Sequence, residues 1–358
     1  MNIADFTYEL PHELIAQTPI EPRDSSRLLV LHRSDGHIEH RHFRDIGDYL
    51  RAGDLLVANQ SRVVPARLLG AKEGSGGRAE ILLLAIRNDL GADYWEALVR
   101  PGRRLRAGQR IVFGDGILAA DILDRTPSGG RIVHLIARAG TVADAIARVG
   151  TVPLPPYIHA PLADAERYQT VYARQPGSAA APTAGLHFTP ELLATLTARG
   201  IGLTTVTLHI GLDTFRPIEE DDLERHVMHS EEIEMDATAA ACINATRAAG
   251  GRIVAVGTTS VRVLESVAAV TAEQRAKGES TDANALVMPY RGRTSLFLRP
   301  GSPFRAVDVM ITNFHLPRST LLVLVSAFAG RELVLRAYEE AVAERYRFYS
   351  FGDAMLIL

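Results

Sequence analysis

The stretch Arg252-Ile253-Val254-Ala255-Val256-Gly257-Thr258-Thr259-Ser260-Val261-Arg262 places a continuous apolar run directly before a glycine and three hydroxyl residues. A short unbroken apolar run is typical of a strand that is buried on both faces, as in a parallel sheet. The residues that follow, Val261–Val270, are predicted to form a helix. A buried strand that leads directly into a helix is the building unit of α/β proteins, so this stretch predicts a layered α/β fold.

Strands and helices continue to alternate on both sides of this stretch, which favours a core with mostly parallel strands. In the first sixty residues we expect strands at Arg27–Leu31, around Ile38 and at Asp54–Ala58, with a helix at Phe43–Leu50. In the second half we expect strands at Gly202–Leu208 and Val307–Ile311, and helices at Leu192–Arg199, Ala237–Ala249, Ser319–Ala329 and Leu333–Tyr346.

Between these parts the chain reads as a series of short strands separated by glycine-rich turns. The expected strands are Ala66–Leu69, Ala79–Ile86, Trp95–Val99, Arg110–Phe113, Ile117–Ile122 and Arg131–Ala137. Short strands at this spacing are typical of a small antiparallel barrel. We therefore expect a layered mixed α/β core domain, residues 1–62 and 151–358, with an inserted small antiparallel β-barrel domain, residues 63–150.

Composition excludes several classes of protein. The single cysteine, Cys242, excludes an internal disulfide framework and a cysteine-rich zinc site. Neither of the two lysines, Lys72 and Lys277, lies in the Gly-Lys-Ser/Thr triplet of a phosphate-binding loop, which excludes P-loop NTPase chemistry. A net charge of −3 argues against non-specific coating of nucleic acid. No apolar run is long enough to span a membrane and the N-terminus is no signal peptide, so we expect a cytoplasmic protein without a membrane partner.

The segment from Gly177 to Thr189 surrounds His187 with small and hydroxyl residues, among them Ser178, Thr183 and Gly185. Small residues let the backbone approach a ligand closely, and imidazole is the side chain that titrates nearest neutral pH. The segment then enters a helix, whose first N–H groups favour negative charge. It therefore predicts a ligand-facing loop. The alternative is a buried turn that contains a satisfied histidine.

Two further segments carry polar residues from the end of a buried strand to the start of a helix. Ligands of open α/β sheets bind at such points. The first segment offers Thr258, Thr259, Ser260 and Arg262 for a nucleoside or a carboxylate, or else simply caps its helix. The second offers Asn313, His315, Arg318 and Ser319 for an anionic group, unless His315 is only structural.

A fourth segment contains His226, His229 and Glu231. Two histidines three residues apart bind metals when they lie on a helix. However, the residues from Glu231 to Met235 alternate like a strand, which favours contact with a polar substrate over a metal site.

The densest basic run falls in the expected barrel. It consists of Arg100, Arg103, Arg104, Arg106 and Arg110. Guanidinium groups on a loop suit phosphate contacts, which position a nucleic acid without reading its sequence. The alternative is a solvated face.

Many ordered stretches of the chain together resemble one enzyme family nearly end to end. They include 8–17, 23–28, 168–172, 177–189, 214–217, 228–231, 256–262, 311–330 and 346–357. On these motifs the chain resembles the S-adenosylmethionine:tRNA ribosyltransferase-isomerases of the queuosine pathway. The departures from the family pattern are Ala179 for Val, Asp213 for Gly and Ser295 for Asp. Asp213 matters most, because an acidic side chain replaces a glycine beside an expected site loop.

The resemblance implies a reaction and its substrates. S-adenosylmethionine is the co-substrate that donates its ribosyl group, and no metal is required. The acceptor is 7-aminomethyl-7-deazaguanine at the wobble position of a tRNA, and the products are epoxyqueuosine-tRNA, methionine and adenine. The chemistry needs a base for the carbon beside the sulfonium, for which His187, His315 and His229 are candidates. Thr258, Ser260 or Asn313 would assist departure of adenine, and Arg262 or Arg318 would bind the methionine carboxylate.

Two other classes of function stay open on the residues alone. One is an S-adenosylmethionine-dependent RNA methyltransferase, against which the absence of a glycine-rich dinucleotide-type loop argues. The other is a non-catalytic RNA-binding module, which the negative net charge and the lack of aromatic stacking repeats disfavour. We expect the protein to be a monomer.

Overall fold

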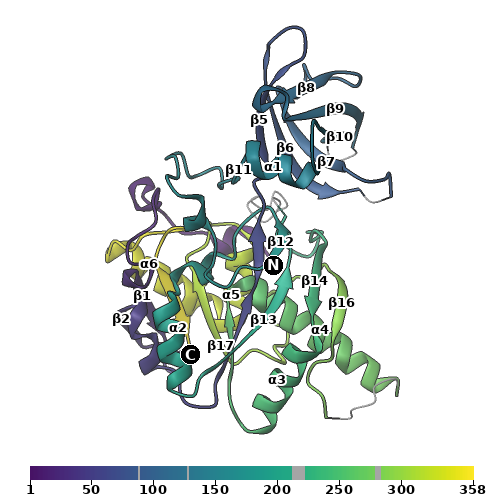
Figure 1. Cartoon of the computed structure of the whole chain (residues 1–358). Helices are drawn as coiled ribbons and strands as arrows, with labels where there is room; N and C mark the ends of the chain where they lie inside the picture. The colour runs from purple at the N-terminus through teal and green to yellow at the C-terminus, as the bar shows by residue number, and fades with distance from the viewer. Residues whose placement is uncertain (88, 127–128, 212–221, 279–283) are drawn as a thin grey trace. The chain divides into compact units, whose positions relative to one another are not determined.

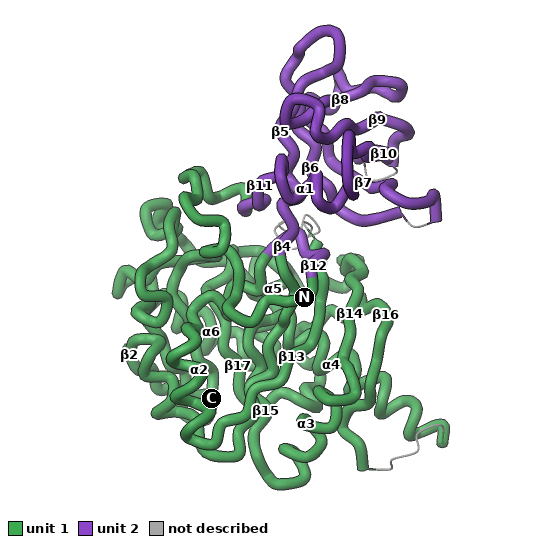
Figure 2. Tube along the Cα trace, viewed as in Figure 1, with its two compact units in different colours: residues 1–62, 155–175, 181–358 green, residues 63–154, 176–180 purple. Residues whose placement is uncertain are grey.

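The computed structural model describes residues 1–87, 89–126, 129–211, 222–278 and 284–358. They form two compact units (Figure 2). Unit 1 contains Met1–Arg62, Pro155–Gln175 and Ala181–Leu358, and unit 2 contains Val63–Leu154 and Pro176–Ala180. That residues 63–150 fold as an independent inserted domain stays a prediction.

A nine-stranded sheet forms the centre of unit 1 (Figure 1). Its strands lie in the order β16-β14-β13-β3-β15-β17-β18-β1-β2. They are β1 Arg27–Leu31, β2 Ile38–His42, β3 Leu55–Asn59, β13 Gly202–Leu208, β14 Glu231–Met235, β15 Ile253–Val256, β16 Tyr290–Thr294, β17 Val309–Asn313 and β18 Ala354–Ile357. A separate two-stranded sheet pairs β4 (Ser61–Val63) with β12 (Gln175–Ser178).

The central strands β13, β3, β15 and β17 are parallel, and β18 is parallel to β1. The other described neighbours in this sheet, including β17 with β18 and β1 with β2, are antiparallel. The expectation of mostly parallel strands was therefore wrong for the sheet as a whole. A tight turn reverses the chain between β1 and β2, and the order of elements in a sequence does not fix the direction in which β18 enters the sheet.

Helices flank this sheet where the sequence predicted them. They are α2 Pro190–Ala198, α3 Ala237–Ala248, α4 Thr258–Ala276, α5 Thr320–Ala329 and α6 Arg331–Ala343. Short 3₁₀ helices lie at Ile3–Phe6, His12–Leu14, Arg23–Ser25, Ala165–Tyr168 and Thr183–His187. The helix expected at Phe43–Leu50 is also a 3₁₀ helix, Phe43–Asp48, which ends with a bond from Tyr49 N to Ile46 O, and Gly47 within it disfavours an α-helix. No helix in the described part of the chain is long and apolar enough to cross a membrane.

The core of unit 1 lies against the central strands. Val256 on β15 and Ile311 on β17 belong to one buried cluster with Phe188 and with Leu192 and Leu196 on α2. The apolar runs of β3, β15 and β17 are thus explained, because these three strands are fully buried.

Unit 2 is built around a closed six-stranded antiparallel barrel. Its strands are β5 Arg67–Lys72, β6 Arg78–Ile86, β7 Tyr94–Arg100, β8 Arg110–Phe113, β9 Leu118–Arg125 and β10 Arg131–Ala137. They pair in the order β5-β6-β7-β10-β9-β8, and β8 pairs back with β5. A short 3₁₀ helix, Gly114–Gly116, the helix α1 (Val142–Val149) and the strand β11 (Gly150–Thr151) complete the unit. The predicted fold class, a layered mixed α/β core with a small antiparallel barrel, is confirmed.

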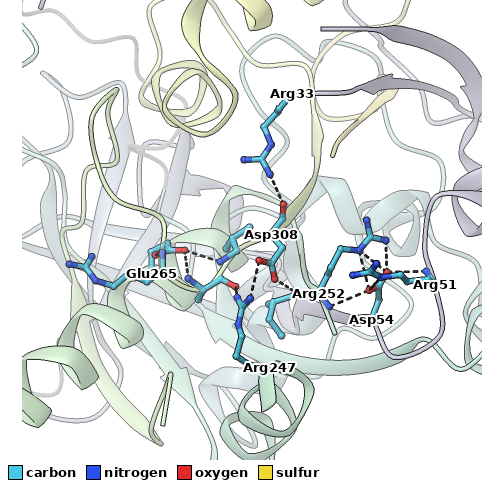
Figure 3. Close-up of polar contacts among 11 residues, drawn as sticks. Arg33, Arg51, Asp54, Arg247, Arg252, Glu265 and Asp308 are labelled. Atoms are coloured by element: carbon cyan, nitrogen blue, oxygen red, sulfur yellow. Dashed lines mark hydrogen bonds and ion pairs between the residues drawn. The ribbon is translucent and has the colours of Figure 1, made fainter. Parts of the chain in front are cut away.

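Ion pairs hold the amino ends of the parallel strands (Figure 3). Asp54, just before β3, binds the guanidinium of Arg252, just before β15, with Nη2 to Oδ2 at 2.6 Å. Asp308, just before β17, accepts from the backbone N–H of Ile253 at 2.7 Å and from Arg247 at 3.0 Å. The charged groups thus fix one edge of the sheet and leave the carboxyl ends of these strands for other contacts.

Candidate functional site

A pocket in unit 1 lies at the carboxyl ends of β15 and β17. Its wall consists of residues 181–184, 257–259 and 312–316, together with Tyr157, Ile210, Leu321, Tyr349 and Ser350. This is the edge at which open α/β sheets bind ligands. We call it the main pocket.

The first turn of α4 forms one wall of the main pocket. Gly257 has φ of +86°, and a Cβ there would lie 3.4 Å from the Ala184 methyl group, so glycine lets the chain turn from β15 into α4. Thr258 and Thr259 line the pocket, and the Thr259 hydroxyl is buried without a hydrogen-bond partner. Ser260 instead donates to Val256 O, at the end of β15, at 2.8 Å, and no described side chain caps the start of α4.

Asn313, the last residue of β17, forms a second wall. Its amide nitrogen donates to Tyr349 O at 3.0 Å, while its oxygen is buried without a hydrogen-bond partner. Tyr349 has φ of +70°, a conformation that non-glycine residues rarely adopt and that often marks a functional site.

His315 follows on the same wall and is buried. Its Nε2 lies 2.7 Å from Thr312 Oγ1, its backbone N–H donates to Tyr338 Oη at 2.9 Å, and its carbonyl accepts from Tyr8 Oη at 2.6 Å. Burial lowers its pKa to about 3. The imidazole is therefore neutral at pH 7 and a weak base.

His187 is also buried, but it lines a second, smaller pocket of unit 1. Its Nδ1 lies 2.7 Å from Ser26 Oγ and its ring stacks on Phe43, whereas its Nε2 has no hydrogen-bond partner. Burial lowers its pKa to about 3, and neighbouring Asn313 offsets part of that effect. His187 thus shares a neighbour with the main pocket without lining it.

The other predicted site residues between Gly177 and Thr189 lie in different places. Thr183 lines the main pocket. A Cβ on Gly185 would lie 2.1 Å from the Tyr172 hydroxyl, so this glycine makes room for a tyrosine rather than for a ligand. Ser178 belongs to unit 2, where its hydroxyl donates to Ala180 O at 2.7 Å.

Arg318 and Ser319, the two other site residues predicted near α5, are not among the residues that line the main pocket. Ser319 caps α5: its hydroxyl accepts from Leu322 N at 3.2 Å and donates to Leu316 O at 2.7 Å. Arg318 is exposed, with φ of +55° and its backbone N–H bound to Phe6 O.

A charged cluster of His229, Glu231 and Arg262 lies at the same sheet edge. His229 Nε2 is 3.2 Å from Glu231 Oε1, and Arg262 Nη1 forms an ion pair with the other carboxylate oxygen. Burial raises the pKa of Glu231, but His229 and Arg262 outweigh burial and hold it below its usual value. Arg262 Nη2 is buried without a hydrogen-bond partner. Glu231 begins a strand, as its alternation predicted, and the described residues contain no group of three side chains placed to hold a metal.

In unit 2, the basic residues Arg100, Arg103, Arg104 and Arg106 are exposed, while Arg110 forms a bidentate pair with Asp121 at 2.7 and 2.8 Å. The loop that carries them is held by buried Arg131, which donates to the carbonyls of Gly102 and Leu105.

Sequence reasoning missed Tyr157, Thr312, Tyr349 and Ser350 of the main pocket. Tyr157 and Tyr349 pack with ring centroids 4.8 Å apart. They come from segments about 190 residues apart, and neither segment has the strand-to-helix pattern that identified the other walls. Asp213 lies outside the described residues.

These features define an α/β protein with a pocket of polar and aromatic residues at the carboxyl ends of its central strands and with a small barrel. The family model described as "Queuosine biosynthesis protein" matches residues 3–357. The chain is 57% identical to a protein of Symbiobacterium thermophilum and 54% identical to one of Moorella thermoacetica, each over 100% of both chains. Both relatives are named S-adenosylmethionine:tRNA ribosyltransferase-isomerase.

The chain is also similar to a solved structure. The crystal structure of S-adenosylmethionine tRNA ribosyltransferase from Thermotoga maritima is 40% identical and covers 99% of this chain and 100% of its own, with a TM-score of 0.54. The chain belongs to the queuosine biosynthesis family.

Proposed function

We propose that this chain is an enzyme that transfers and isomerises the ribosyl group of S-adenosylmethionine onto tRNA. The observation that carries the proposal is full-length identity of 57% and 54% to relatives that bear the name of this activity. The methyltransferase alternative is not favoured, because the named relatives are ribosyltransferases.

In detail, the acceptor is the 7-aminomethyl-7-deazaguanine base at the wobble position, and the products are epoxyqueuosine-tRNA, methionine and adenine. A base removes a proton from the carbon beside the sulfonium, adenine leaves, the aminomethyl nitrogen attacks, and ring closure expels methionine. No metal is needed, because the sulfonium charge already acidifies this carbon. The enzyme works in the cytoplasm as a monomer.

The main pocket suits the adenosyl group of the co-substrate. Thr258, the unpartnered Thr259 hydroxyl and the Asn313 side chain supply hydrogen-bonding groups for a purine or a ribose. The rings of Tyr157 and Tyr349 lie on the same pocket, and aromatic faces attract a cation such as a sulfonium. Arg262 Nη2 is the donor left for the methionine carboxylate, since Nη1 is paired with Glu231.

Among the three base candidates we propose His229. A base works best when its pKa is near the operating pH, whereas burial lowers the pKa of both His187 and His315 to about 3. His229 is instead oriented by Glu231, as the bases of many enzymes are by a carboxylate. His187 and His315 then position Asn313 and the pocket wall.

The exposed arginines of unit 2, Arg100, Arg103, Arg104 and Arg106, are proposed to contact phosphates of the tRNA, with Arg110 held by Asp121. Removal of one arginine–phosphate pair should reduce the slope of log affinity against log salt by about 0.7–0.9. Unchanged affinity and slope on replacing Arg103 and Arg104 by glutamine would contradict this placement.

The function is tested by incubating the protein with S-adenosylmethionine and tRNA that carries the modified wobble base, and by quantifying adenine and S-adenosylhomocysteine. We expect tRNA-dependent adenine, and a His229→Gln variant slowed by about 10²-fold or more, as loss of a general base typically gives. S-adenosylhomocysteine with methylated tRNA would refute the function. An unaffected His229→Gln variant would refute only the choice of base.

A further inference from the structure

The second pocket of unit 1 contains two arginines that the reaction described above does not use. Arg23 and Arg167 lie on its wall with His187, and Ser350 lines both this pocket and the main one. We call it the arginine pocket. All of its residues belong to unit 1.

Most described hydrogen-bond partners of these arginines are neutral carbonyl oxygens. Arg23 Nη1 donates to Gln169 O at 2.7 Å and Nη2 to Glu166 O at 2.9 Å. Arg167 Nη2 donates to Ile20 O at 2.7 Å. Such contacts fix the direction of each guanidinium without neutralising its charge.

The carboxylate that pairs with Arg167 lies at the surface. Glu21 forms an ion pair with Arg167 Nε, and its side chain is 67% exposed against 15% for the arginine. Burial, and then the neighbouring charge of Arg167, lower the pKa of Arg23, and the charges of Glu21, Asp164 and Glu166 offset only part of this. Arg347, which donates to Thr18 O, adds a third positive charge near His187. An anion bound between these groups offsets their positive charge.

The arginine pocket is also next to the reacting groups. Its floor residue His187 neighbours Asn313 of the main pocket, and Ser350 belongs to both. An RNA substrate whose modified base meets the co-substrate bound at the main pocket therefore brings its own backbone close to Arg23 and Arg167.

We propose that the arginine pocket binds a phosphodiester group of the RNA substrate, beside the nucleotide that is modified. The inference rests on the proposed function. A small carboxylate needs one bidentate arginine, whereas two guanidinium groups that line one pocket suit an RNA backbone, with its repeated charge. Recognition at this point would fix the reacting nucleotide without reading its sequence.

The test compares Arg167→Gln and Arg167→Lys with Arg199→Gln, an exposed arginine paired with Asp48 at the amino-end edge of the sheet. For each variant we measure the melting temperature, the KM for S-adenosylmethionine, and tRNA affinity from 50 to 200 mM salt. We expect Arg167→Gln to weaken tRNA binding about 10-fold and to reduce the salt slope by about 0.7. Arg167→Lys should keep the slope, Arg199→Gln should match the wild type, and the KM for S-adenosylmethionine should stay within twofold.

Two results would overturn the inference. An unchanged salt slope in Arg167→Gln that is folded and still turns over substrate makes the arginine purely structural. A raised KM for S-adenosylmethionine with an unchanged slope assigns the pocket to the methionine carboxylate instead. Failure of the proposed function is a separate result, because the wild-type protein itself would then release no adenine in the presence of tRNA.

Discussion

Asn313 anchors Tyr349: its side-chain amide donates to the Tyr349 carbonyl oxygen at 3.0 Å and so connects the end of β17 to a residue with φ of +70°. Gly352 N donates to the same oxygen at 2.9 Å. Residues in this backbone region persist only where their surroundings hold them. The contact therefore fixes Tyr349 on the wall of the main pocket, next to Ser350, which lines both pockets.

Replacing Asn313 by alanine should reduce kcat/KM by at least about 10-fold, because misplaced positioning groups cost up to about 10²-fold in rate. The matched control is Asn244→Ala, since Asn244 also donates to a backbone carbonyl, Val287 O at 2.9 Å, but comes from α3. Thermal melts and steady-state kinetics of both variants show whether Asn313 contributes to activity beyond its effect on stability. If the two lose equal stability and equal activity, Asn313 has only a structural role.

Gly257→Ala should raise the KM for S-adenosylmethionine by moving the first turn of α4. Gly278 at the other end of α4 provides the control, because it has a similar φ of +72° but open space where a Cβ would lie. Both alanines should add backbone strain, about 1–2 kcal/mol at Gly278 and up to about 3 kcal/mol at Gly257, whose ψ of 156° lies in a region that is essentially restricted to glycine. A KM that rises equally in both variants would show that strain alone is responsible.

The buried histidines should make the protein acid-sensitive. Their pKa is about 3 in the folded state against an ordinary 6.5, so between these pH values the unfolded chain binds protons that the native one does not. Stability is therefore full above pH 6.5 and falls as pH decreases toward 3, by up to about 1.4 kcal/mol per pH unit for each histidine. Urea unfolding at pH 7.5, 6.0 and 5.0 measures this slope. The two histidines His187 and His315 should contribute about equally to the pH dependence of the free energy of unfolding, so His315→Gln should remove about half of their joint contribution. A slope that does not change in this variant would show that His315 is not the source of the acid sensitivity.

Asp54→Ala should destabilise the fold by about 3 kcal/mol, because it leaves the Arg252 guanidinium without its buried partner. Asp48→Ala, which breaks the exposed pair with Arg199, should cost less than about 1 kcal/mol. Urea unfolding gives both values. Because Asp54 lies at the amino ends of the strands, kcat of the folded variant should stay within about threefold of wild type, and a larger loss would place this edge in the site.

The sequence predicted the barrel, the helices that flank the central sheet and most strands of that sheet, because each has a local pattern, but it missed β16 and β18. It could not predict the direction of β18, which depends on how the chain returns from α6. Nor could it tell which hydroxyls face the pocket: Ser260 bonds the end of β15 and Ser319 caps α5, while Thr259 is left unpartnered on the pocket wall. A hydroxyl at a helix start has the same local pattern in both roles.

The environment of His187 could not be predicted from the sequence either. Its ring bonds Ser26 and stacks on Phe43, both more than 140 residues earlier in the chain. These contacts bury the imidazole and make it a weak base, although the surrounding small residues predicted a ligand-facing group. The basicity of His187 therefore depends on residues far away in the sequence, which the local pattern does not show.

The most direct test of the account follows two labels of S-adenosylmethionine into tRNA that carries the aminomethyl-deazaguanine base. One sample is labelled in the ribose and the other in the methyl group, and the tRNA is purified and counted after complete reaction. The account predicts about one ribose label per tRNA, an equal amount of free adenine, and no methyl label. Methyl label in the tRNA without ribose label would contradict it.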